Sequence, residues 1–243
     1  MPGELQWVSG ANIDLRYRGN ELKRRKIWIQ DGPTDEKVLV YSYTGWQSPI
    51  AFATSDWNKD PALKKVCEKY NAFVQKAGFD YANNAIVTGY DNGNDNIGYH
   101  YDKQRSLSSN GAIAVVKAGG RRRFCIRKRI IPQKKESKEQ KKEREKQQAT
   151  MPNLFDEYVP SGALIFMTMK ANFETQHAVP ATSEKPGLSG SIVFRTVSQD
   201  YCKTVTALGK ATAKVHAARA ARAGKRNAEA MRWSITDDEL QDV

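Results

Sequence analysis

The sequence predicts a mainly β fold flanked by helix, of the β-sandwich or jelly-roll type. Three observations lead to this prediction. The chain has 243 residues, 40% of them hydrophobic, which is enough to bury one full core. Many short β-branched or aromatic segments end at turn residues, and one clear helix precedes most of them. Many short strands beside a single helix favour two packed β layers with helix on one side.

The predicted elements follow in order along the chain. Residues 1–60 read as short strands separated by turns, chiefly 23–32 ("KRRKIWIQDG") and 37–45 ("KVLVYSYTG"). The clearest helix covers 60–79, because Pro61 follows Asp60, apolar residues recur at helical spacing and Gly78 ends the pattern. Further strands are expected at 84–90, 111–119, 122–131, 162–168 and 189–198.

Two strongly charged segments stand apart from this pattern, so we expect a single domain over 1–203 with decorations. Residues 132–150 carry seven bases and four acids without apolar periodicity, which predicts a solvated insert, either helical or disordered. Residues 204–243 form an Ala-rich basic segment with an acidic end, and we predict a helical tail. The tail either contacts nucleic acid or only keeps the chain in solution.

The charge and the cysteines narrow the classes of protein. The formal net charge is +12, which favours an anionic partner such as DNA or RNA. The runs 23–26 ("KRRK") and 121–123 ("RRR") are candidate phosphate contacts or solvated strand edges. No apolar run is long enough for a membrane span, and the first residues do not resemble a secretory signal. Three scattered cysteines fit reduced thiols, so we expect an intracellular protein, cytoplasmic or nuclear.

The segment "NDNIGYHYD" (94–102) contains the strongest chemical signal. His100 and Asp102 lie two residues apart, so on a strand both side chains point to one face. His177 follows another apolar segment, and two histidines with one carboxylate form the facial triad of non-haem Fe(II). Arg195 ends an apolar strand and needs an acidic partner, either a dicarboxylate cosubstrate or a structural Asp. The alternative for the histidines is ordinary hydrogen bonding.

Several blocks between residues 24 and 201 resemble the AlkB-like Fe(II)/2-oxoglutarate dioxygenases. "NAIVTGYDNGNDNIGYHYD" is similar to the block that leads through a Gly turn into Ile-Gly-x-His-x-Asp. "VPSGALIFMTMKANFETQHAVP" resembles the segment with the second histidine, and "LSGSIVFRTVS" resembles the closing arginine strand. "VLVYSYTGW" is similar to the stretch that shapes the base pocket in nucleic-acid-demethylating members. The resemblance implies a double-stranded β-helix, that is, a cupin-like jelly roll.

The resemblance also implies roles for individual residues. His100, Asp102 and His177 would bind the iron. The cosubstrate 2-oxoglutarate would contact Tyr90, Thr88 and Arg195. The target base would contact four residues, namely Tyr41, Tyr43, Trp46 and Gln104.

Three departures from the family pattern involve five residues. Thr88 stands where the family has Asn, Ser189 where it has a first arginine, and Ser191 where it has Asn. Lys103 and Gln104 follow Asp102 in place of an acidic residue that helps to read the base. Neither Ser nor Thr replaces a guanidinium group, so Arg195 would be the remaining arginine of the carboxylate clamp.

The function implied by the resemblance is oxidative demethylation of alkylated or methylated bases, as in DNA repair, with Fe(II), 2-oxoglutarate and O2. Since a base inside a duplex is out of reach, the substrate would be single-stranded or a flipped base. Two alternatives remain open on the sequence. One is an oxygenase of the same fold that acts on protein or a small molecule, and the other is a non-catalytic nucleic-acid-binding module.

Overall fold

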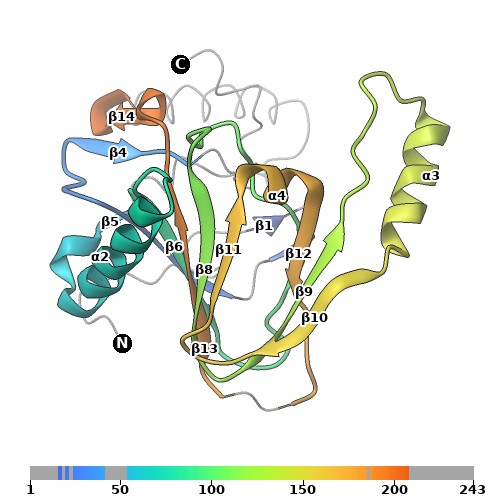
Figure 1. The fold of residues 1–243 in the computed structure, drawn as a ribbon, viewed down its shortest axis with the longest axis horizontal. Coiled ribbons are helices and arrows are strands. Elements are labelled where there is room, and N and C mark those ends of the chain that lie inside the picture. Colours follow the sequence, from blue (N-terminus) through green and yellow to red (C-terminus); the bar gives the residue numbers. More distant parts are fainter. Residues whose placement is uncertain (1–15, 18–19, 22–23, 42–53, 185–186, 208–243) are drawn as a thin grey trace, which may run out of the picture.

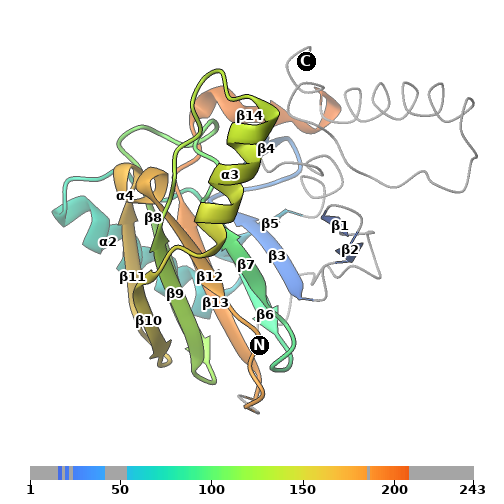
Figure 2. The same ribbon diagram turned by 90° about the vertical axis from the view of Figure 1, so that its right-hand side faces the viewer.

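A computed structural model describes residues 16–17, 20–21, 24–41, 54–184 and 187–207 (Figure 1). The predicted base-pocket residues Tyr43 and Trp46 lie outside these ranges, as does most of the predicted basic tail (208–243). The described part contains two facing sheets with helices outside them (Figures 1 and 2). Its helices include none with the length and apolar character that crossing a bilayer requires.

The two sheets are those of a jelly roll, which confirms the predicted fold class. From β6 to β13 the chain passes back and forth between the two layers, and only β9 and β10 are consecutive in one sheet. The larger sheet has six strands in the order β11 (Leu164–Thr168), β8 (Ala112–Gly119), β13 (Ser189–Arg195), β6 (Asn84–Tyr90), β3 (Arg25–Gln30) and β5 (Ser55–Asp56). The smaller has four, in the order β10 (Asn153–Val159), β9 (Arg122–Lys128), β12 (Thr175–Val179) and β7 (Ile97–His100).

Two short pairs of strands lie outside these sheets. β1 (Arg16–Tyr17) pairs with β2 (Asn20–Glu21), and β4 (Lys37–Leu39) pairs with β14 (Cys202–Thr204). Two single-turn 3-10 helices, η1 (Trp57–Lys59) and η2 (Gln199–Tyr201), complete the connections.

Helix α2 (Pro61–Lys76) covers the outer face of the larger sheet, as the sequence predicts for its single clear helix. Asp60 caps it by accepting a hydrogen bond from the backbone N–H of Leu63, and Pro61 begins its first turn. Tyr70 of α2 stacks on Phe194 of β13 with 4.5 Å between ring centroids. The strands of this sheet are therefore apolar on the side under α2, while their other side faces the smaller sheet.

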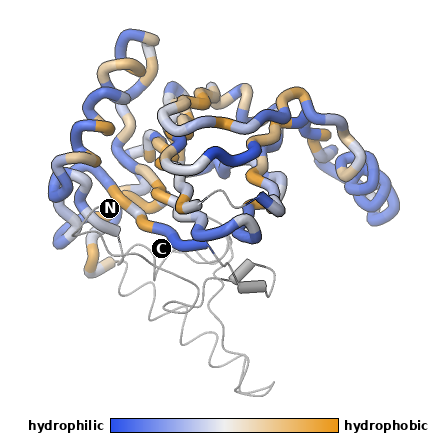
Figure 3. Tube along the Cα trace, turned by 90° about the horizontal axis from the view of Figure 1, so that it is seen from below, coloured by the Kyte–Doolittle hydropathy of each residue, from blue (hydrophilic) through white to orange (hydrophobic). Residues whose placement is uncertain are grey.

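The charged insert between β9 and β10 contains helix α3 (Lys138–Ala149), which extends away from the two sheets (Figure 1). Ser137 and Gln140 form a capping box at its start, and nearly all of its residues are polar (Figure 3). It contacts the body through Gln148, which accepts from the N–H of Ile130 and donates to the carbonyl of Lys128, and through the carbonyl of Ala149, which accepts from Arg127. The insert is thus helical, one of the two conformations that the sequence left open.

Among the elements that were not predicted individually are β10, the short helix α4 (Met169–Glu174) and β12. The last two matter most for function, because α4 turns the chain from the larger sheet into the smaller one. His177 consequently lies inside a paired strand rather than in the loop that follows β11.

Candidate metal centre

His100 and His177 lie directly opposite each other on neighbouring strands. The register pairs His177 of β12 with His100 of β7 and, on its other side, with Ile126 of β9. Directly paired residues point to the same face of a sheet, so both imidazoles enter the space between the two layers. Their ring centroids are 4.3 Å apart.

A β-bulge in β7 gives His100 this orientation. Between the pairs His177–His100 and Val179–Ile97, β7 contains one more residue than β12. Ile97 and His100 both line the inner cavity although they are three positions apart, an odd spacing that places side chains on opposite faces of a regular strand. The carbonyl of Gly98, within the bulge, lies 2.8 Å from Nδ1 of His100. Since a carbonyl only accepts, Nδ1 carries the proton and Nε2 has the free lone pair.

Asp102 completes the cluster. One ligand atom from each of His100, Asp102 and His177 lies within 4.8 Å of the other two. Arg195 of β13 pairs with the Asp102 carboxylate, with Nε and Nη2 at 2.9 and 2.8 Å from Oδ2. Both side chains are at most 5% exposed.

Arg195 thus pairs with Asp102, the kind of structural Asp that the sequence left open as its partner, and its role in binding the cosubstrate carboxylate stays a prediction. The physical reason is that Asp102, buried without a counter-charge, would be strongly unfavourable.

Asn172 of α4 fixes the backbone at Asp102. Its side-chain oxygen accepts from the Asp102 N–H and its Nδ2 donates to the Asp102 carbonyl, both at 2.8 Å. The side chain of Asn172 is fully buried. The same short helix that leads the chain to His177 therefore also holds the third candidate ligand.

The protonation states favour cation binding. Burial, followed by the proximity of His177, lowers the pKa of His100 to about 3, and burial also lowers the pKa of His177. Burial alone raises the pKa of Asp102, but the positive charge of Arg195 and the two histidines outweigh it and lower this pKa. All three side chains are consequently in the deprotonated form that metal ions require.

These residues fit a ferrous ion by their chemistry. Two imidazoles and one carboxylate are the donor set of non-haem Fe(II) oxygenases, which leaves coordination positions for other ligands. Nδ1 of His177 is buried and meets no hydrogen-bond partner among the described residues. A buried imidazole nitrogen without a protein partner, at such a cluster, fits a site that binds a ligand.

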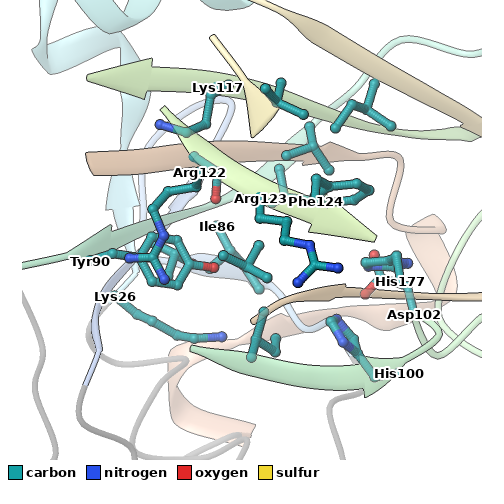
Figure 4. Close-up of a pocket in the computed structure, with 18 of the residues that line it drawn as sticks. Lys26, Ile86, Tyr90, His100, Asp102, Lys117, Arg122, Arg123, Phe124 and His177 are labelled. Atoms are coloured by element: carbon teal, nitrogen blue, oxygen red, sulfur yellow. The ribbon is translucent and has the colours of Figure 1, made fainter. Parts of the chain in front are cut away.

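A cavity between the sheets extends from this cluster into the molecule (Figure 4). The three candidate ligands lie at one end, and Lys26, Tyr90, Lys117 and Arg122 gather at the other. Apolar side chains line the space between, among them Ile86, Val115, Phe124, Ile165 and Val193.

The cosubstrate and substrate residues predicted from the sequence occupy different places. Thr88 and Tyr90 line the cavity. Tyr41 is buried, and the Arg195 guanidinium lies 4.5 Å from its ring centroid, so its ring contacts the arginine behind the candidate metal centre. Gln104 donates from Nε2 to the carbonyl of Met169, next to the start of α4. The roles of these residues in binding ligands stay predictions.

The structure adds Lys26, Lys117, Arg122 and Asn172, which sequence reasoning did not assign to the site. Two of them belong to the runs "KRRK" and "RRR", for which only outward-facing roles were considered. Lys26 and Arg122 are instead 3% and 2% exposed and point into the cavity. The available signal was strand alternation, since a basic run on a strand sends every second side chain inward.

No protein-family model matches the sequence, and no curated protein matches it. Among solved structures, the chain is similar to OsALKBH1 (TM-score 0.32, 16% identity) and to YcfD, a ribosomal oxygenase from Escherichia coli (TM-score 0.29, 12% identity). The first alignment covers 55% of this chain and 60% of OsALKBH1, and the second covers 66% of this chain and 36% of YcfD. Similarities this weak carry no argument, so the functional proposal depends on the geometry described above.

Proposed function

We propose that the protein is an Fe(II)/2-oxoglutarate-dependent dioxygenase that oxidatively demethylates alkylated or methylated bases in DNA or RNA. The observation that carries the proposal is the paired register of His100 and His177 with Asp102 beside them, at the end of a cavity inside a jelly roll. This arrangement provides both a metal-binding donor set and an enclosed space next to it.

The chain's own residues would bind and orient the reactants. His100, Asp102 and His177 would hold the ferrous ion, which supplies the O2 chemistry that protein side chains lack. Arg195 and Asn172 would fix the carboxylate ligand, one through its oxygen and the other through its backbone. The apolar wall of Ile86, Val115 and Val193 would exclude water from the space beside the metal.

The overall reaction balances with O2 as the oxidant. Decarboxylation of 2-oxoglutarate gives succinate and CO2, with one oxygen atom entering succinate and the other an N-methyl group of the base. The resulting N-hydroxymethyl group then loses formaldehyde, which restores the N–H of the base.

Charge supports nucleic acid as the substrate. The formal charge of the chain is +12. Tyr99 and Tyr101 flank His100 in the sequence, and the Arg127 and Arg129 guanidinium groups lie 3.8 and 3.6 Å from their ring centroids. Positive charge near the candidate metal centre suits a phosphate backbone.

The test is turnover with chemically defined substrates. The protein, Fe(II), 2-oxoglutarate and O2 are incubated with methylated single- and double-stranded DNA and RNA, and succinate and formaldehyde are measured, with His177→Ala as control. Formaldehyde that appears with a methylated oligonucleotide, and only with the wild-type protein, supports the proposal. Succinate without formaldehyde from any oligonucleotide would favour an oxygenase for protein or small molecules. The absence of both products, with salt-dependent oligonucleotide binding, would favour a binding module.

A further inference from the structure

A polar row crosses four adjacent strands of the larger sheet at the inner end of the cavity. The register pairs Lys117 of β8 with Ser191 of β13, Ser191 with Thr88 of β6, and Thr88 with Lys26 of β3. Because the pairs are direct, all four side chains point to one face, and all four line the cavity. Two lysines thus flank two hydroxyl groups inside the protein.

An apolar row separates these residues from the metal centre. Two residues further along each strand, Val115, Val193, Ile86 and Trp28 are paired in the same way. Arg195, the partner of Asp102, lies two more residues along β13. The polar row is therefore four residues, or about 13 Å along the strand, from the row of Arg195. The cavity thus has the candidate metal centre at one end, an apolar wall in the middle and cations at the other end.

Lys117 and Arg122 bring positive charge to this end of the cavity. Neither Lys117 nor Arg122 forms an ion pair with a carboxylate of the described residues. Arg122 donates instead to the carbonyls of Asn92, Asp95 and Pro180. Burial, together with the charge of Arg122, lowers the pKa of Lys117 to about 8, which shows that a positive charge is unfavourable there. A bound anion would relieve this.

The two lysines have different geometry. Nζ of Lys117 donates to the carbonyls of Ala118 and Gly120 and to Oγ of Ser189, at 2.6, 2.6 and 2.8 Å, which uses all three of its protons. The side chain of Lys26 instead extends along the cavity, with its Nζ directed toward the end where His100 lies (Figure 4). Lys26 is thus placed to contact a ligand, and Lys117 to hold Ser189 and add positive potential.

We propose that Lys26, with Thr88 and Ser191 beside it and Lys117 behind them, binds the distal carboxylate of 2-oxoglutarate. The inference rests on the proposed function. It assigns the charge to lysines of two flanking strands, because the resembling family's first arginine is replaced by Ser189, whose hydroxyl accepts from Lys117.

The experiment compares two ligands that differ only at the proposed contact. 2-Oxoglutarate and 2-oxovalerate have the same five-carbon 2-keto acid chain, but the second lacks the distal carboxylate. Their binding to the Mn(II)-loaded protein is measured by calorimetry without O2, so no turnover is involved. The variants are Lys26→Met, Lys26→Arg and Lys117→Met, with Lys69→Met as the matched control on the exposed side of α2.

The wild type and Lys69→Met are expected to bind 2-oxoglutarate more tightly than 2-oxovalerate. Lys26→Met is expected to bind 2-oxoglutarate roughly 10- to 100-fold more weakly, as the loss of a charged hydrogen bond implies, and 2-oxovalerate unchanged. Lys26→Arg is expected to retain most of the preference, and Lys117→Met to lose less of it than Lys26→Met.

Two results would overturn the inference while leaving the proposed function intact. One is a Lys26→Met protein that keeps the wild-type preference for 2-oxoglutarate. The other is a Lys26→Met protein that loses both ligands, since the lysine would then support the whole site rather than one carboxylate. A wild-type protein that binds Mn(II) but neither keto acid would instead contradict the proposed function itself.

Discussion

Replacing Asn172 with alanine is expected to weaken both the folded state and the metal centre. The side chain is fully buried and makes two hydrogen bonds, one to the N–H and one to the carbonyl of Asp102. Alanine leaves both backbone groups buried without these partners, at about 1–3 kcal/mol for each unsatisfied group. For the two groups together, the free energy of unfolding should therefore fall by about 2–6 kcal/mol. Loss of a residue that orients a ligand should also lower metal affinity roughly 10- to 100-fold.

The chain contains a matched control in α2. Asn71 makes the same pair of bonds to the backbone of Ala82, accepting from its N–H at 2.9 Å and donating to its carbonyl at 3.1 Å. Asn71→Ala should also destabilise the fold but leave metal affinity unchanged, because Ala82 lies away from the cavity. Stability is measured by urea unfolding with a chelator present, and metal affinity by competition with a fluorescent chelator. The reasoning is refuted if Asn172→Ala binds metal as the wild type does, or if both variants lose metal affinity equally.

Three further predictions concern charge and metal. Arg195→Met leaves Asp102 buried without its counter-charge, so stability without metal should fall by about 3–5 kcal/mol. Mn(II) should then stabilise this variant more than it stabilises the wild type, and equal effects of Mn(II) in urea unfolding would contradict this. Mn(II) at about 100 times its dissociation constant should stabilise the wild type by about 2.7 kcal/mol and His177→Ala by far less, as followed by thermal unfolding; the same shift in both proteins would argue against the triad. The pKa of Lys117 is lowered from 10.5 to about 8, so between these pH values the unfolded chain binds more protons than the folded one. Wild-type stability should therefore rise with pH relative to Lys117→Met, and parallel stability curves for the two proteins would contradict this.

The strands of the larger sheet could be predicted because both of their faces are covered. Segments such as 84–90 and 189–195 are rich in apolar and small residues since α2 packs on one side and the smaller sheet faces the other. The end of α2 and its cap follow from Asp60, Pro61 and Gly78. By contrast, β10 is exposed along most of its length, and its residues show no clear apolar alternation.

The candidate ligands could be predicted from their types and spacing, but their surroundings could not. The pairing of His177 with His100 depends on the short helix α4 and on the bulge near Gly98. No local sequence pattern predicts either feature. Lys26 meets Thr88 through register between strands far apart in the sequence. A run of basic residues resembles a solvated edge until that register is known. The partner of Asp102 depends in the same way on where β13 ends.

The central claim is that one ferrous ion and one 2-oxoglutarate bind together at His100, Asp102 and His177. The most direct measurement is the visible absorption spectrum under anaerobic conditions, after addition of Fe(II) and then 2-oxoglutarate. A weak charge-transfer band that requires both additions is predicted for the wild-type protein, and no band is predicted for His177→Ala. A wild-type spectrum without the band, or a band of equal strength in His177→Ala, would contradict the proposed metal centre.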